Sequence, residues 1–406
     1  MARFSNPIAI AGMGCVLPSG LGAERFWQAA RDGRSGIVPL RSADFHSRRI
    51  SAFGHVTQED HQRCREDVAQ NLQRYGALSM IWGVSAVRQA LQEAGVDPSR
   101  DRLTFGLYCC QGGYTHPSLE SYADLLRDCT AAQGGLDSRK LAKRVLQDHA
   151  LEPFLVLKSL SNCLLGIVSL AYKLESECNA YMQGVAGNQA ALREACAALL
   201  SYRVDVAIVV GAGSELDAMA LSALVQAGVI SATGADSFRP FDQAGTGGIA
   251  GEGAAALILR RSEDQPGARQ TQLVGLSAHA ELSGLELPAY PVDLLVCSGS
   301  AIPERDRQLC ETLAQAKPKA ITNIQPVTGL LSAAPSLVDL ILARSALQAQ
   351  CVPPIIGLSQ PVAEGLPFAT GTSRPARLHR CAVLNRDDNG FSACYQLEYR
   401  DDPRDS

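Results

Sequence analysis

A tight turn that feeds an Ala-rich helix is the place in this sequence where a nucleophile would be most useful. A helix N-terminus favours developing negative charge, so many α/β enzymes hold an attacking group there. The turn comprises Gln183, Gly184, Val185, Ala186 and Gly187. None of these side chains can attack a carbonyl carbon. The sequence therefore predicts a site that is built but carries no nucleophile.

The 13 cysteines of the chain are the other possible nucleophiles. They are scattered, form no CxxC pair, and stand mostly in apolar segments, which is typical of small buried side chains in a reducing compartment. Cys163, Cys178 and Cys297 lie nearest to the segments of interest, but no histidine stands beside them in the sequence. The spacings fit no zinc-ligand pattern. We therefore expect no disulfide, no metal site and no cofactor.

The composition is that of a globular protein. Hydrophobic residues make up 46% and charged residues 19% of the 406 residues, so the chain can bury a large core. A net charge of −4 gives no basic footprint for nucleic acid or an anionic membrane. The apolar runs are too short to span a membrane, and the first strand leaves no room for a signal peptide. We expect a cytoplasmic protein.

The elements that must position the turn alternate between strands and helices. An apolar helix over 162–174 leads through an exposed loop into the Ala-rich helix, which runs into the apolar strand 206–210. Polar excursions over 40–72 and 112–150, the second with a mixed-charge helix, interrupt this order. After a charged Pro-Gly linker over 261–270 the alternation begins again.

The same strand–helix alternation on both sides of the linker suggests an internal duplication. Beyond the linker, helices are predicted over 303–316 and 335–349. We therefore expect an N-terminal half over 1–262 and a C-terminal half over 271–406, together forming one compact unit. Long apolar strands further predict an α/β protein whose central sheets are covered by helices on both faces.

Five segments of the chain resemble the β-ketoacyl synthases, the condensing enzymes of the thiolase-like fold. Segment 8–37 resembles the family's first strand and helix, 162–174 its N-x-x-x-G-x-x-S-x-x-Y-x-L helix, and 237–259 its RPFD…GEGA signature. Segments 323–336 and 352–358 resemble its T-G stretch and the strand that follows. The resemblance covers nearly the whole chain in the family's order. It implies two duplicated halves whose mixed sheets are sandwiched by helices in a layered αβαβα arrangement.

The chemistry of that family needs one cysteine and two histidines. The cysteine takes the acyl chain as a thioester, and the histidines assist decarboxylation and stabilise the enolate. By the resemblance the cysteine position falls on Val185, and a two-residue shift would place Gln183 there. The histidine positions fall on Ser298 and Leu330, and the family's lysine falls on Gln325. The resemblance thus implies no catalytic residue at these positions.

The resemblance therefore points to the non-catalytic ketosynthase-like subunit called the chain-length factor, or ketosynthase β. Its family pairs with an active ketosynthase in a heterodimer that condenses malonyl units onto a carrier-bound polyketide, aryl-polyene or fatty-acid-like chain. The inert subunit would stabilise the active one and shape the acyl tunnel. The alternative is that the apolar residues considered for the subunit interface and the acyl tunnel only fill the core of this chain. The interface and tunnel candidates are Phe154, Val156, Leu160, Asn162, Gln183 and Val185.

Two alternatives remain open at this point. An active or decarboxylating β-ketoacyl synthase would have to use substituted residues, for which Cys297, Cys178 and Cys163 are the candidates. A homodimeric scaffold without an active partner would need no chemistry at all.

Overall fold

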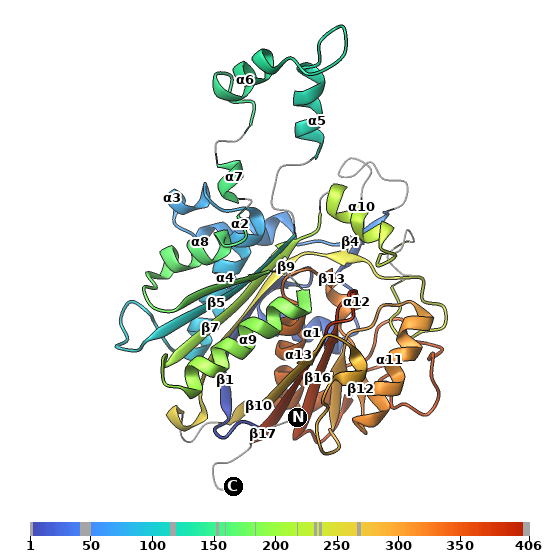
Figure 1. Cartoon of the computed structure of the whole chain (residues 1–406). Helices are drawn as coiled ribbons and strands as arrows, with labels where there is room; N and C mark the ends of the chain where they lie inside the picture. Colours follow the sequence, from blue (N-terminus) through green and yellow to red (C-terminus); the bar gives the residue numbers. More distant parts are fainter. Residues whose placement is uncertain are drawn as a thin grey trace.

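The computed structural model describes residues 3–40, 50–113, 119–151, 154–158, 160–182, 184–216, 218–230, 234, 238–265 and 269–400. Most strands in these ranges belong to one eleven-stranded sheet (Figure 1). β2 (Gly20–Leu21) pairs with β1 at its side. The other strands follow one path, in the order β12 (Ile321–Thr322), β11 (Leu294–Cys297), β16 (Arg380–Arg386), β17 (Ser392–Arg400), β10 (Gln270–His279), β1 (Ile8–Leu17), β9 (Gly253–Arg261), β7 (Val206–Ser214), β5 (Phe105–Gly113) and β6 (Cys178–Met182).

The path consists of two groups of strands with the same pairing pattern. In the first, β6, β5 and β7 are parallel, and β9 and β1 follow antiparallel. In the second, β12, β11 and β16 are parallel, and β17 and β10 follow antiparallel. The groups join where β1 meets β10. A duplicated unit would give this repetition, so we retain the division at 262–271 as a proposal.

Helices cover both groups and also separate them. α9 (Gly184–Leu200) and α13 (Pro335–Ala349) lie inside, and their buried side chains share the largest core cluster with strands of both groups. α4 (Leu78–Ala94) and α8 (Cys163–Tyr172) pack on the other face of the first group. α11 (Pro303–Gln315) packs on the other face of the second. The layers thus follow the α-β-α-β-α order expected from the sequence.

The other described elements are short. A second sheet has the order β13-β8-β4-β3 and lies beside the site described below. Within the ranges given above, no helix is both long and apolar enough to cross a membrane. The short elements are α1 (Ala23–Arg31), α2 (Gln58–Glu66), α3 (Gln70–Gln73), α7 (Leu155–Lys158), α10 (Ala218–Gln226), α12 (Gln325–Thr328), β3 (Ile37–Pro39), β4 (Ala52–Gly54), β8 (Ala250–Gly251), β13 (Leu330–Leu331), β14 (Cys351–Val352), β15 (Arg374–Pro375) and the 3₁₀ turns Ser262–Asp264 and Leu282–Gly284.

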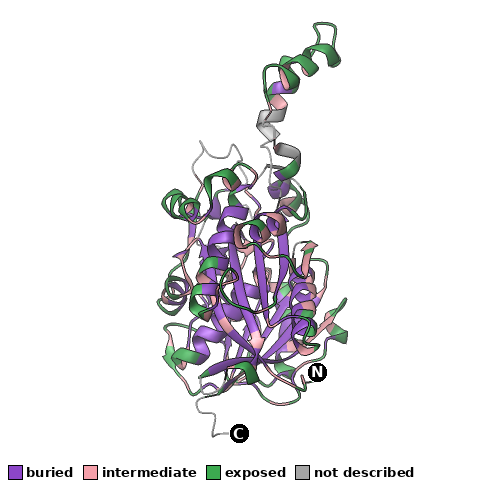
Figure 2. Cartoon of the chain, turned by 90° about the vertical axis from the view of Figure 1, so that its left-hand side faces the viewer, coloured by how far each residue is buried: buried purple, intermediate pink, exposed green. Residues whose placement is uncertain are grey.

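A helical hairpin stands away from the body of the molecule, as Figures 1 and 2 show. It consists of α5 (Leu119–Asp128) and α6 (Ser138–Leu146) and lies in the predicted polar excursion, which therefore holds two helices. Thr130 forms an antiparallel bridge with Leu136, and the Asp137 side chain caps α6 by accepting from the Lys140 N–H. We call this hairpin the arm.

Two predictions about irregular structure were wrong. Segment 178–182 is the edge strand β6, not an exposed loop. Its sequence CNAYM is only partly apolar, which fits a strand whose side chains are half-buried or exposed at the end of the described sheet. The excursion 40–72 contains α2, α3 and β4, while residues 41–49 lie outside the described ranges. α2 is polar almost throughout, so it lacks the apolar periodicity that would reveal a helix.

Candidate functional site

The turn from β6 into α9 is shaped by two glycines. Gly184 has φ of 84°, the left-handed conformation that favours glycine, and its N–H donates to the Ser332 carbonyl at 2.6 Å. A Cβ at Gly187 would lie 1.6 Å from the Met182 carbonyl oxygen. These contacts press the N-terminus of α9 against the segment that follows β13. The helix end that would hold a nucleophile is therefore closely packed.

Val185 occupies the second position of α9. Its side chain is 3% exposed and belongs to the large core cluster between the two strand groups. A branched apolar side chain thus fills the place that the resemblance gives to the cysteine. Gln183, the alternative position, lies outside the described residues.

Ser298, at the position of the first histidine, follows β11 and is buried. Its hydroxyl donates to the Leu384 carbonyl at 3.4 Å and accepts from the Arg386 N–H at 3.1 Å. It also accepts from the Asn385 side-chain amide at 3.4 Å. The hydroxyl is therefore occupied in joining β11 to the end of β16.

The same hydrogen-bonded chain reaches a buried carboxyl group that the sequence analysis missed. Asn385 Nδ2 donates to Asp339 Oδ2 at 2.6 Å. Burial raises the pKa of Asp339 to about 7, although the Asn385 hydrogen bond acts in the opposite direction. This chain of described polar groups contains no thiol and no imidazole. A lone acidic residue in the apolar helix 335–349 was the available signal.

Gln325, at the lysine position, opens α12 and connects two loops. Its Oε1 accepts from the Gly299 N–H and from Asn323 Nδ2, both at 2.8 Å. Asn323 Nδ2 also donates to the Cys297 carbonyl at 2.7 Å. The neutral amide therefore holds the loop after β11 against α12, close to Ser298.

Leu330, at the position of the second histidine, lies in β13 and fills space. Its N–H donates to the Ile249 carbonyl at 2.7 Å. Its side chain packs on the small clusters around Phe53 and Phe238. A Cβ at Gly248 would come within 2.4 Å of the Leu330 Cδ1, so this side chain needs a glycine beside it. The structure thus joins the neighbourhoods of Ser298 and Gln325 through hydrogen bonds, but Val185 and Leu330 pack into separate clusters.

A strained pair of loops is nevertheless kept beside these positions. Phe241 of the RPFD motif and Ala301 have φ of 62° and 54°, conformations that cost free energy in residues other than glycine. The buried Asp306 carboxylate accepts from the Phe241 N–H at 2.8 Å and from the Ser300 N–H at 2.7 Å. Burial raises the pKa of Asp306, and these donors oppose the shift. The Asp306 carboxylate thus holds the two loops together beside the site.

The three candidate cysteines are unsuited to nucleophilic attack. Burial raises the pKa of each thiol, and that of Cys297 lies well above its ordinary value. Cys297 Sγ donates to the Thr322 carbonyl and Cys163 Sγ to the Tyr75 carbonyl. Cys178, in the edge strand, is only partly buried. Because the thiolate is the attacking species, all three stay in the unreactive form at neutral pH.

Several described histidines interact with residues outside these positions. His55 pairs with Glu252 of the GEGA motif at 2.5 Å, and His61 Nδ1 accepts from the Trp82 indole at 3.2 Å. Among the described residues, no group of three histidine, cysteine or acidic side chains could hold a metal ion.

The interface candidates before α8 fall into two classes. Phe154 packs edge-to-face on Tyr75 at 4.8 Å between ring centroids, and the Arg74 guanidinium lies over both rings. Leu160 is 45% exposed, and Asn162 is an exposed residue at the start of α8. The side chain of Val156 lies outside what the structure describes. Phe154 therefore packs within its own subunit, while Leu160 is available to a partner.

The edge of β6 is an open and partly apolar surface near the site. No described strand pairs with its outer edge, which ends the sheet. Beside it α7, α8 and their connection expose Leu157, Leu160 and Leu170, and β6 itself exposes Met182 at 59%. We call these four side chains and β6 the apolar edge. Unpaired edge strands with apolar neighbours are normally covered in a working protein.

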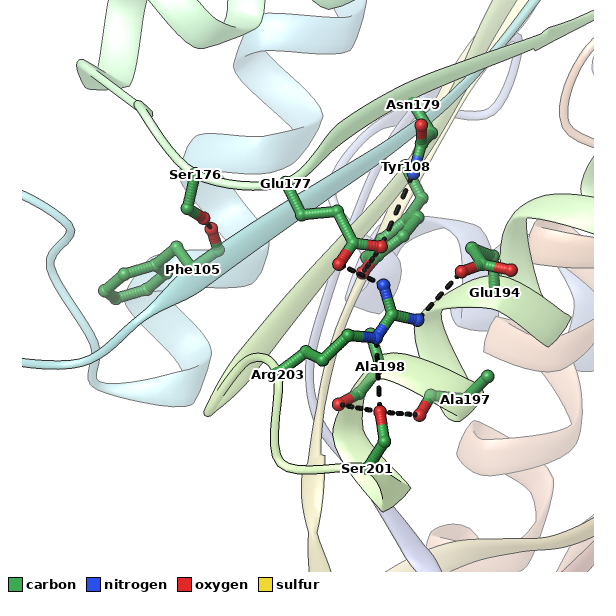
Figure 3. A network of polar contacts seen from close by, with 10 residues as sticks. All are labelled: Phe105, Tyr108, Ser176, Glu177, Asn179, Glu194, Ala197, Ala198, Ser201 and Arg203. Carbon is green, nitrogen blue, oxygen red and sulfur yellow. Dashed lines mark hydrogen bonds and ion pairs between the residues drawn. The ribbon is translucent and has the colours of Figure 1, made fainter.

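A polar network fixes the start of β6, as Figure 3 shows. Arg203, after α9, forms ion pairs with Glu177 and, at 2.8 Å, with Glu194. The Tyr108 hydroxyl of β5 donates to Glu177 at 3.0 Å. Burial and this bond raise the pKa of Tyr108, which stays protonated as the donor. The network ties the apolar edge to α9 and β5.

The comparisons with known proteins agree with this architecture. The chain is 26% identical over 434 residues to the granaticin polyketide putative beta-ketoacyl synthase 2 of Streptomyces violaceoruber, with 96% of each chain covered. The structure of the ishigamide ketosynthase/chain length factor superposes with a TM-score of 0.77 at 18% identity, covering 98% of this chain and 100% of that one. A type II polyketide synthase acyl-carrier protein in complex with its ketosynthase, bound to the hexaketide, gives a TM-score of 0.74 at 18% identity, covering 97% and 99%.

The family itself is shown by a match to a family model. Residues 5–265, more than half of the chain, match the model described as "Beta-ketoacyl synthase, N-terminal domain". The superpositions place the fold among the thiolase-like ketosynthases. This chain therefore belongs to the β-ketoacyl synthase family.

Proposed function

We propose that this chain is a non-catalytic chain-length factor that partners an active ketosynthase in an acyl-condensing heterodimer. The observation that carries the proposal is the buried Val185 at the N-terminus of α9, where a nucleophile would have to stand. Ser298 and Gln325 serve as hydrogen-bonding links, and Leu330 serves as packing. A side chain without a lone pair cannot form a thioester.

The apolar edge supports the partnership. An open parallel edge strand can accept a strand from a second subunit of the same fold, which would extend the sheet and satisfy its free N–H and C=O groups. The exposed Leu170 and Met182 would lose contact with water in the same step. A permanent subunit interface of this kind is rich in apolar side chains.

The shared substrate would be a growing chain carried by an acyl carrier protein. One of the similar solved structures is a ketosynthase/chain length factor, and another is an acyl-carrier protein in complex with its ketosynthase. In this proposal the partner supplies the cysteine and histidines, and this chain contributes wall to the tunnel that limits chain length. We propose the cytoplasm as the site of action, since malonyl and carrier chemistry takes place there.

Co-expression with an active ketosynthase tests the proposal directly. The pair is purified, incubated with malonyl- and acyl-carrier protein, and analysed as intact subunits by mass spectrometry. We expect a one-to-one complex in which the acyl adduct forms on the ketosynthase and not on this chain. A stoichiometric thioester on any cysteine of this chain would refute the proposal. A stable homodimer that does not bind the ketosynthase would favour the alternative of a homodimeric scaffold.

A further inference from the structure

A cavity of about 510 Å³ lies at the edge of the second strand group that is opposite to the candidate functional site. The residues that line it are Pro291, Asp293, Lys319, His379 and Arg380. Asp293 directly precedes β11, Lys319 stands two residues before β12, and Arg380 begins β16. These three strands are parallel, so their starts meet at one edge of the sheet, whereas Ser298 follows the end of β11. The cavity is therefore separate from the site described above.

The segments that enter the strands at this edge are basic. They are residues 290–293, 316–320 and 376–380. Together they contain one acidic residue, Asp293, and four basic residues, Lys317, Lys319, Arg377 and Arg380. The whole chain, by contrast, has a net charge of −4. Positive charge is thus in excess in the segments that form the cavity.

The one carboxylate that lines the cavity is already bound by groups of the protein. Asp293 Oδ1 accepts from the Lys319 ammonium at 2.7 Å. Its Oδ2 accepts from the N–H groups of His379 and Arg380 at 2.8 and 2.9 Å. Burial acts to raise the pKa of Asp293, but these donors outweigh it and hold the pKa below its ordinary value. Asp293 therefore serves to join the three entering segments.

The charge of Arg380 is only partly compensated. Its guanidinium carbon lies 4.8 Å from the centre of the Tyr290 ring, and its Nε lies 3.7 Å from Glu398 Oε1. Glu398 Oε2 accepts from Arg3 Nη2 at 2.6 Å. Arg3 belongs to the start of the chain, which lies at this end of the sheet (Figure 1). Two guanidinium groups thus share one carboxylate.

His379 adds a neutral donor to the cavity. Arg377 Nε donates to His379 Nε2 at 2.9 Å. Because a guanidinium cannot accept a hydrogen bond, the imidazole must be neutral and carry its proton on Nδ1. No described group accepts from that N–H, and the exposed Arg377 forms no ion pair with a described residue. The cavity wall therefore offers an ammonium, a guanidinium and an imidazole N–H.

We infer that this cavity binds a small molecule that carries a phosphate group. A phosphate dianion matches the excess of positive charge, and its several oxygens can use the donors of Lys319, His379 and Arg380. A single carboxylate has one charge and two oxygens, so it would use fewer of these donors. The volume is that of a small-molecule site, which leaves room for an organic part against Pro291. The inference goes beyond the function proposed above and does not depend on it.

Isothermal titration calorimetry at constant ionic strength tests the inference. The protein is the complex with the ketosynthase or, if none assembles, the full chain alone. The probes are inorganic phosphate, adenosine monophosphate and, as the matched molecule without phosphate, adenosine. We expect saturable one-to-one binding of the first two at millimolar concentration or below and no binding of adenosine.

Two variants change the cavity without removing a buried group. Lys319→Gln with Arg377→Gln takes away two exposed cations, and Asp293 keeps its two backbone donors. Phosphate affinity should fall about tenfold. Pro291→Glu adds a carboxylate to the wall and breaks none of the contacts given above, so it should weaken binding as well. Melting temperatures measured without probe show that each variant is folded.

A matched control removes the same charge away from the cavity. Arg307→Gln with Arg102→Gln replaces one exposed arginine that pairs with Glu304 and one that pairs with no described residue. This variant should bind phosphate like wild type. Equal weakening by the two double variants, or unchanged binding by the cavity variants, would overturn the inference. It would also be overturned if wild type bound neither phosphate probe, or bound adenosine as tightly as adenosine monophosphate.

Discussion

The N-terminus of α9 and the edge of β6 are separated by one short turn but differ in nearly every physical respect. At the helix end, Val185 is buried and Gly187 packs directly against the Met182 carbonyl. Just before the turn, Met182 is mostly exposed, and β6 has an outer edge that no described strand covers. The position that the resemblance gives to the cysteine lies in the core, while the strand edge beside it is open. Under the proposed function, this chain therefore acts through its surface.

The largest effect should come from placing negative charge on the apolar edge. Leu170→Asp with Met182→Asp should abolish co-purification with the ketosynthase, because two carboxylates would have to be buried without partners. Size-exclusion chromatography of the co-expressed pair measures this. Val38→Asp changes another exposed apolar residue, far from β6 in the sheet order, and should leave the complex intact. Assembly of the double variant at wild-type level would remove the apolar edge from the interface.

The buried Asp339, which is linked to Ser298 through Asn385, should make the stability of the protein depend on pH. Because burial raises the pKa of Asp339 to about 7, the folded protein binds a proton that the unfolded chain releases near pH 4. The native state therefore loses stability as pH rises from about 4 to about 7. Asp339→Asn keeps an acceptor for Asn385 and should remove this loss, which is worth up to about 4 kcal/mol at pH 8. Thermal unfolding of both proteins between pH 4.5 and pH 8 measures the difference. An unchanged pH dependence would show that Asp339 does not titrate in this range.

The buried elements of this contrast could be predicted from the sequence, but the open strand edge could not. Residues 335–349 and 206–210 form a helix and a strand as expected, since long apolar patterns specify buried elements. The edge strand 178–182 was missed because a strand paired on one side needs no strong alternation. The bond between Asn385 and Asp339 joins residues 46 positions apart, and no local pattern reports such a contact. Helices and strands with a long apolar pattern could be predicted from the sequence. The edge strand and the hydrogen bonds between distant residues could not.

A cysteine at position 185 tests whether a nucleophile alone would make the N-terminus of α9 reactive. Val185→Cys is nearly isosteric, so it should cost less than about 1.5 kcal/mol of stability. We expect no acyl adduct on the new cysteine by intact mass, because Ser298 and Leu330 supply no imidazole and burial keeps the thiol protonated. Val185→Ala is the packing control and should cost about 2 kcal/mol through the cavity that it leaves. Rapid acylation of the cysteine variant would mean that the site needs only a nucleophile.

The smallest effect should come from the polar network that ties the start of β6 to α9 and β5. Arg203→Gln removes the charge that pairs with Glu177 and Glu194, leaving the first residues of β6 less firmly held. The side chain is largely exposed, so the folded state should persist with little change in melting temperature. The edge would then lose order before binding, and affinity for the ketosynthase should fall a few-fold. Arg63→Gln breaks a comparable exposed pair with Glu59 in α2 and serves as the matched control. Equal affinities for the two variants would mean that the apolar edge is held by the sheet alone, since β5 already supplies its backbone partners.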